Sequence, residues 1–180
     1  SIFNTDNTMK RISMMTALLL MAVMSLQAQS LQGKWTANAE KDADGDTSKL
    51  VLIFNQGNKA QMEMQMEHNE PEVGSFTCTM ILPGTYQQKG NKVTLNYQVN
   101  QSTVRLDKMR LVGEYAQAIE KNPETKKAVE SMMQEEMDKE IKKQFKDEVP
   151  FDGELTIKKL TNTTLELDDD GDTMVFTRVH

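Results

Sequence analysis

Two aspartate-rich segments carry the residue types that most readily suggest chemistry. Residues 42–46 read Asp-Ala-Asp-Gly-Asp and residues 168–172 read Asp-Asp-Asp-Gly-Asp. An EF-hand calcium loop has its glycine at the sixth position and a glutamate at the twelfth, whereas Gly45 and Gly171 are fourth and neither twelfth residue is acidic. Asp-Gly between two strands is a strong hairpin signal, so we predict two turns, with a weak calcium site as the alternative.

Catalytic residue types are sparse. The chain has two histidines, His68 at a predicted strand end and His180 at the C-terminus, and no nucleophile motif, phosphate loop or metal-ligand spacing. Cys78 is the only cysteine, so it forms no disulfide within the chain, and its place in an apolar row predicts a small buried group rather than a reactive thiol. We therefore predict no catalytic residues, no metal and no cofactor.

The elements that position these residues follow from hydrophobic periodicity. Between Leu31 and Leu111 apolar and polar residues alternate, with turn residues at short intervals, as in antiparallel strands joined by hairpins. Methionines at 62, 64 and 66 lie on one face of one strand, and Phe76, Cys78, Met80 and Leu82 form the next row, which we expect to end at Pro83-Gly84.

The spacing of apolar residues changes from every second to every fourth position after Glu114. Asn122 is a good N-cap and Pro123 a good first helical residue, and apolar residues then recur every four positions from Val129 to Phe145. This pattern predicts an amphipathic helix over about 123–147, with a shorter helix over about 115–121 before it. From Gly153 onward apolar and polar residues alternate again, and this pattern predicts three final strands.

This order of elements predicts a mainly β fold. We expect an antiparallel up-and-down barrel of about eight to ten strands, with the helices inserted at about 114–148, because closure removes the exposed edges of so large a sheet. A two-sheet sandwich is the structural alternative. The helix could act as a lid over one mouth of the barrel or could pack on its outside.

Three residues near the two ends of the chain strengthen the barrel prediction. Gly33 and Trp35 open the first predicted strand and Arg178 lies in the last, and in a closed barrel the first and last strands are neighbours. A guanidinium can then stack on the indole across the closing seam. We therefore assign Gly33, Trp35 and Arg178 a structural role in barrel closure.

The same residues resemble the lipocalins of the calycin superfamily. There a Gly-x-Trp motif opens the first strand and an arginine of the last strand packs over the tryptophan. The resemblance covers nearly all of the chain after its N-terminal segment and implies a bacterial lipocalin-like barrel. Two features depart from a typical lipocalin: the middle of the chain has no Thr-Asp-Tyr motif, and the main helix precedes the last three strands.

The N-terminal segment predicts export. Lys10 and Arg11 precede an apolar run from Met14 to Val23 that is too short to span a membrane, and Ala28 is a plausible cleavage point. We therefore interpret residues 1–28 as a leader with a signal peptide at 9–28, and residues 29–180 as a single soluble domain of the periplasm or the extracellular space. A net charge of −6 without a basic stripe argues against nucleic acid as a partner.

The leading functional hypothesis is a non-catalytic binding protein. Methionine is flexible and polarizable, so a barrel lined by it could hold a small hydrophobic or amphipathic ligand. The alternative is a barrel with a filled core that engages a protein partner through the helix at 123–147. Strand alternation selects the following cavity-lining candidates: Phe54, Met62, Met64, Met66, Phe76, Met80, Leu95 and Tyr97.

Overall fold

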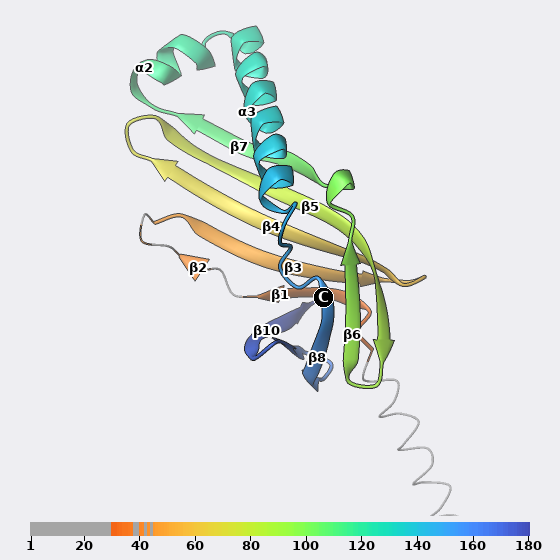
Figure 1. Ribbon diagram of the computed structural model, residues 1–180. Coiled ribbons are helices and arrows are strands. Elements are labelled where there is room, and N and C mark those ends of the chain that lie inside the picture. Colours follow the sequence, from red (N-terminus) through yellow and green to blue (C-terminus); the bar gives the residue numbers. More distant parts are fainter. Residues whose placement is uncertain (1–29, 38–39, 42, 44) are drawn as a thin grey trace, which may run out of the picture.

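The computed structural model describes residues 30–37, 40, 41, 43 and 45–180, so the predicted signal peptide lies outside the described residues (Figure 1). The strands are β1 (Gly33–Ala37), β2 (Glu40–Lys41), β3 (Thr47–Asn55), β4 (Lys59–Glu70), β5 (Gly74–Lys89), β6 (Lys92–Tyr97), β7 (Thr103–Leu111), β8 (Gly153–Leu160), β9 (Thr164–Asp169) and β10 (Asp172–Val179). The helical elements are η1 (Val99–Gln101), α2 (Gly113–Tyr115), the π-helical turn η2 (Ala116–Glu120) and α3 (Pro123–Gln144).

Eight of these strands form a closed antiparallel barrel. The pairing runs β1-β10-β9-β8-β6-β5-β4-β3, and β3 pairs with β1 to complete the ring. The predicted mainly β barrel, with its helical insertion before the last three strands, is thus confirmed, and the sandwich is not formed.

The sheet continues beyond the barrel on one side. Residues 74–81 of β5 pair with β7, whereas residues 84–89 of the same strand pair with β6, a barrel strand. The first residues of β3 and the second half of β4 extend in the same direction. We call this part, made of residues 47–50, 64–70, 74–80 and β7, the sheet extension (Figure 1).

One predicted strand boundary is wrong. Pro83-Gly84 does not end a strand, because β5 runs on to Lys89. The carbonyl of Pro83 accepts from the amide of Gln98 at 2.8 Å, and β5 changes partner from β7 to β6 at this point. Proline lacks the N–H that a continuous ladder requires, so it is tolerated where the ladder changes partner.

Both aspartate-rich segments are hairpin connections, as predicted. β2 and β3 form a hairpin in which Lys41 pairs with Thr47, and Asp169 pairs with Asp172 across the second turn. Asp170 and Gly171 have φ values of 49° and 101°, as a two-residue hairpin turn requires.

Helix α3 lies across the sheet extension at the open end of the barrel (Figure 1). The Asn122 side chain caps it by accepting from the amides of Glu124 and Thr125, as predicted. Ile141 and Phe145 are buried in the core, and the Gln134 side chain accepts from the Leu106 amide of the edge strand β7 at 3.1 Å. The apolar stripe of the helix therefore faces the inside of the sheet.

The floor of the barrel is filled with side chains. The largest fully buried ones are Trp35, Phe54, Phe176, Leu31, Leu52, Met62, Met80, Leu82, Leu95, Leu155, Leu165 and Leu167. Interior side chains of an eight-stranded barrel are just able to fill it, so the space for a ligand has to be sought toward the open end.

Candidate functional site

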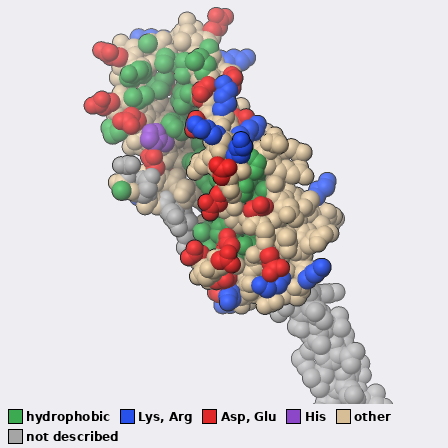
Figure 2. All heavy atoms as spheres, viewed as in Figure 1, with side chains coloured by type: hydrophobic (Ala, Val, Ile, Leu, Met, Phe, Trp, Pro, Cys, Tyr) green, Lys and Arg blue, Asp and Glu red, His purple; other side chains and the backbone are tan. Residues whose placement is uncertain are grey.

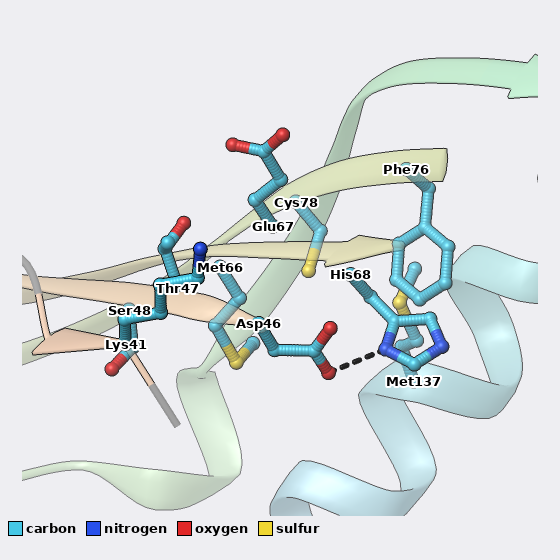
Figure 3. Close-up of a pocket in the computed structure, with 10 residues that line it drawn as sticks. All are labelled: Lys41, Asp46, Thr47, Ser48, Met66, Glu67, His68, Phe76, Cys78 and Met137. Atoms are coloured by element: carbon cyan, nitrogen blue, oxygen red, sulfur yellow. Dashed lines mark hydrogen bonds and ion pairs between the residues drawn. The ribbon is translucent and has the colours of Figure 1, made fainter. Parts of the chain in front are cut away.

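A hollow of about 380 Å³ lies at the open end of the barrel, between α3 and the sheet extension. We call it the mouth hollow, and Figure 3 shows its lining. Its wall combines apolar and polar side chains: Lys41, Asp46, Thr47, Ser48, Met66, Glu67, His68, Phe76, Cys78 and Met137. The volume falls in the range of pockets that hold small molecules.

The apolar wall is a direct product of strand alternation. In the register of β4 and β5, Met66 pairs with Cys78 and His68 with Phe76, so the four side chains form one patch on the inward face. The rings of His68 and Phe76 lie 5.1 Å apart between centroids. Met137 of α3 covers this patch (Figure 3).

The polar side of the hollow contains a close carboxylate–imidazole pair. Asp46 Oδ2 lies 2.5 Å from His68 Nδ1, and Asp46 Oδ1 accepts from the Asn69 amide at 3.2 Å. The hydrogen bond with His68 is the main cause that lowers the pKa of Asp46, so this carboxylate is ionised at neutral pH. On the other side of the ring, Nε2 lies 3.9 Å from Glu70 Oε2.

Sequence reasoning missed this pair. We predicted the Asp46 segment as a turn and placed His68 at a strand end, and both statements hold. The register of β3 and β4 explains the contact, because Thr47 pairs with Glu67. Asp46 precedes Thr47 and His68 follows Glu67, so the antiparallel pairing brings these two residues together.

Cys78 lines the mouth hollow but is not an activated thiol. The residue is buried, and burial together with the nearby charge of Asp107 raises the pKa of the thiol. It is therefore protonated at neutral pH, which agrees with its prediction as a small buried group.

The eight predicted lining residues lie in four different places. Met66 and Phe76 line the mouth hollow, and Met64 lines a smaller neighbouring one of about 180 Å³ together with Phe151 and Met174. Phe54, Met62, Met80 and Leu95 belong to the filled floor. The eighth, Tyr97, packs its ring against the backbone of Gly84, where a Cβ atom would lie 2.9 Å from the tyrosine Cδ1.

The Tyr97 hydroxyl is buried without a hydrogen-bond partner among the described residues. Burial and the nearby charge of Asp152 raise the pKa of the phenol, so the group stays neutral. Because an unpaired buried hydroxyl costs about 1–3 kcal/mol, we expect Tyr97→Phe to raise the free energy of unfolding by about 1 kcal/mol. Urea unfolding measures this difference.

Tyr86→Phe is the matched control, because the Tyr86 hydroxyl donates to the Asn55 carbonyl at 3.4 Å. This second variant should lose stability or leave it unchanged. A Tyr97→Phe protein less stable than the original would show that the hydroxyl has a partner, such as a buried water.

The three barrel-closing candidates come together at the opposite end of the molecule. Trp35 pairs with Arg178 in the β1–β10 register, and the guanidinium carbon lies 4.1 Å from the centroid of the indole ring. The guanidinium also donates to the carbonyls of Ser30, Gln32 and Asn162 at 2.8, 2.5 and 2.7 Å.

Gly33 gives the Arg178 guanidinium its space. Its φ is +125°, which a side chain rarely adopts, and a Cβ atom there would lie 2.6 Å from Nη1 of the arginine. This group of residues is far from the mouth hollow and has no part in its lining.

A second hollow along the same strands is lined mostly by residues with polar side chains. It measures about 430 Å³, and Thr79 donates to Asp107, whose other oxygen accepts from Arg105 at 2.6 Å. Burial raises the pKa of Asp107, but the hydrogen bonds from Thr79 and Arg105 outweigh it and lower the pKa overall. The charged and hydroxyl groups of Asp107, Arg105 and Thr79 make this second hollow less suited to an apolar molecule than the mouth hollow.

Hydrophobic side chains gather over the end of the molecule that carries α2, β7 and the tips of β4 and β5 (Figure 2). Tyr115 and Met132 on the helical elements are 50% and 67% exposed. Apolar surface is thus accessible at the same end as the mouth hollow.

Metal ligands of the usual kinds do not gather in the part of the chain that the structure describes. No three or more His, Cys, Asp and Glu side chains there lie together in a way that could hold a metal ion. The helices among these residues also include none that is both long and apolar enough to cross a membrane.

Comparison with solved structures adds a structural likeness. No protein-family model and no curated protein matches this sequence. A solved structure that matches is the lipocalin-like protein from Bacteroides uniformis ATCC 8492, at 1.79 Å resolution. The match has 15% sequence identity and a TM-score of 0.35, and it covers 83% of this chain and 98% of that chain.

Proposed function

We propose that this protein is an exported bacterial binding protein that holds a small apolar or amphipathic molecule in the mouth hollow, without catalysing a reaction. Export rests on the predicted signal peptide, and the N-terminal residue of the mature protein tests it. Cleavage after Ala28 would leave Gln29 first, and we expect the protein in the periplasm or outside the cell.

The observation that supports binding is the combination of a hollow with apolar walls and a filled floor below it. Met66, Phe76 and Met137 offer flexible or flat apolar surface, which adapts to molecules of different shape. The Asp46–His68 pair gives the same hollow a polar side, so an amphipathic molecule can bury its apolar part and keep its polar part at the rim.

The test is the binding of an environment-sensitive apolar fluorophore to Met137→Lys. A lysine at this position projects a charge into the apolar wall, so we expect the dissociation constant to rise at least about tenfold. Fluorescence titration measures the dissociation constant, and native mass spectrometry after exposure to a lipid and metabolite extract identifies retained molecules.

Met132→Lys is the matched control. Met132 lies on the same helix but is 67% exposed and does not line the mouth hollow, so this variant should bind the fluorophore as the original protein does. Equal loss of binding in both variants would indicate that the fluorophore adheres to the exposed helix surface. No binding by the original protein would remove the proposal.

A protein partner is the second candidate function. The filled floor and the exposed Met132 and Tyr115 favour it, because exposed apolar side chains on one end of a molecule are common at interaction sites. In that case Met132→Lys would abolish capture of the partner, whereas Met137→Lys would have a smaller effect.

A further inference from the structure

The smaller hollow of about 180 Å³ adjoins the mouth hollow because of the register of β3 and β4. Ser48, which pairs with Met66, lines both hollows. Leu50 and Met64 form the next pair on the same face and line the smaller hollow only. An apolar chain that lies in the mouth hollow can therefore continue into the smaller one. The lining of the smaller hollow is mostly apolar: Ala37, Ser48, Lys49, Leu50, Met64, Pro150, Phe151 and Met174.

The ring of Phe151 separates the smaller hollow from the filled floor of the barrel. Phe151 belongs to the connection between α3 and β8, which passes close to β1 and β3 (Figure 1). Its ring lies 6.0 Å from that of Phe176 between centroids, at an interplanar angle of 76°. Phe176 is fully buried in the floor, whereas Phe151 lines the hollow above it. The Phe151 ring is thus the boundary between the space for a ligand and the packed core.

The backbone holds this ring in a conformation that phenylalanine rarely adopts. The amide of Asp152 donates to the carbonyl of Val149 at 3.3 Å, which closes a turn with Pro150 and Phe151 at its centre. Phe151 has a φ of 56°. A proline followed by a residue of positive φ is typical of a type II turn, in which the second central position favours glycine or asparagine. A bulky residue at this position is under backbone strain.

Contacts on both sides of the turn maintain this strained conformation. The Asp152 side chain accepts from the amide of Tyr97 in β6 at 3.0 Å, and Gly153 pairs with Leu95 of the same strand. Val149, at the other side of the turn, packs against the core. Glycine in place of Phe151 would form the same turn without strain. The chain therefore keeps an unfavourable residue at the position where its ring meets the hollow.

We infer that Phe151 sets the depth of the ligand site, so that the protein selects amphipathic molecules by the length of one unbranched apolar chain. This inference rests on the proposed function. The polar group of the molecule stays at the rim of the mouth hollow, the chain passes Met66 and Ser48, and its end meets the Phe151 ring. Each buried methylene group strengthens binding roughly fourfold. A chain longer than the two hollows leaves its excess methylene groups in water and gains no affinity from them.

The test is the displacement of the apolar fluorophore by 1-alkanols of increasing length. For the original protein we expect the affinity to rise roughly fourfold with each methylene group and to level off once the chain reaches Phe151. Phe151→Ala opens the space in front of Phe176, so the longest alkanols should bind at least about tenfold more tightly than to the original protein, and the shortest equally well. Phe151→Trp makes the hollow shallower and should move the plateau to shorter chains.

Phe145→Ala is the matched control, because Phe145 is buried in the core and lines neither hollow. This variant should lose stability and keep the chain length at which the affinity levels off. Phe151→Gly repeats the length test without the strain, and it should have a higher Tm than Phe151→Ala.

The results for the original protein and for its variants have separate meanings. An original protein that binds neither the fluorophore nor any alkanol would remove the proposed function and this inference with it. An original protein that binds both, with the same plateau in Phe151→Ala, Phe151→Gly and Phe151→Trp, would overturn this inference alone.

Discussion

Replacing Arg178 with alanine should lower the free energy of unfolding by about 3 kcal/mol. The guanidinium stacks on Trp35, and this contact contributes about 0.5–2 kcal/mol. It also donates hydrogen bonds to three carbonyls, and a hydrogen bond that involves a charged group contributes about 1.5–3 kcal/mol. Partial exposure to water reduces these values. For a protein of this size the loss corresponds to a fall of roughly 6–12 °C in Tm.

Two other variants separate the possible causes of this loss. Arg178→Lys keeps the positive charge, but the lysine ammonium group lacks the planar set of donors that bonds to three carbonyls. This variant should therefore be more stable than Arg178→Ala and less stable than the original protein. Arg110→Ala removes an exposed arginine of β7 and should change Tm by little. The mouth hollow is remote from this seam, so fluorophore affinity should survive in Arg178→Ala. An unchanged Tm in this variant would contradict the barrel-closing role.

The closed barrel was predictable because the sequence indicates both the strands and the pairing of the first strand with the last. The alternation of apolar and polar residues indicated the strands. The positions of Trp35 and Arg178 near the two ends of the chain indicated that the first and last strands pair. Asn122 and Pro123 marked the start of α3 in the same way, since the capping geometry depends on only a few adjacent residues.

The extent of the sheet extension was not predictable from the same rows. Phe76, Met80 and Leu82 are equivalent in the alternation, yet Phe76 lines a hollow and the other two are fully buried. Phe76 and Met80 both lie in the half of β5 that pairs with β7, so neither the face nor the pairing partner distinguishes them. Alternation reports the face of a side chain and not its depth along the barrel.

The Asp46–His68 pair was missed for a related reason. The two residues are 22 positions apart, and their approach depends on the register of β3 and β4. A shift of the pairing by one residue would place them on opposite faces. Turn chemistry indicated where the chain reverses, but only the complete ladder shows which polar groups meet beyond the end of a strand.

The sheet extension itself depends on a glycine. Gly74 at the start of β5 has a φ of +141° and pairs with Leu111 at the end of β7. A Cβ atom at this position would overlap the carbonyl oxygen of Arg110 and lie 2.8 Å from the Cα atom of Leu111. Both obstacles are backbone atoms, so the strands themselves have to move apart to accommodate a methyl group.

We therefore expect Gly74→Ala to lower the free energy of unfolding by about 3 kcal/mol. Backbone strain at a φ that residues other than glycine rarely adopt accounts for roughly 1–3 kcal/mol, and the displacement of β7 adds the rest. Phe76 is two residues away and lines the mouth hollow, so the variant should also bind the apolar fluorophore more weakly. Urea unfolding and fluorescence titration on the same preparation measure both effects.

Gly57→Ala isolates the contribution of the overlap. Gly57 also has a positive φ, +72°, but a Cβ atom there has no heavy atom within 4 Å, so this variant incurs only the backbone strain. The loss in Gly74→Ala beyond that in Gly57→Ala then measures the cost of separating β5 from β7 together with the greater backbone strain at a φ of +141°. If they lose equal stability, β7 is not held rigidly on β5, and the sheet extension cannot position the wall of the mouth hollow as proposed.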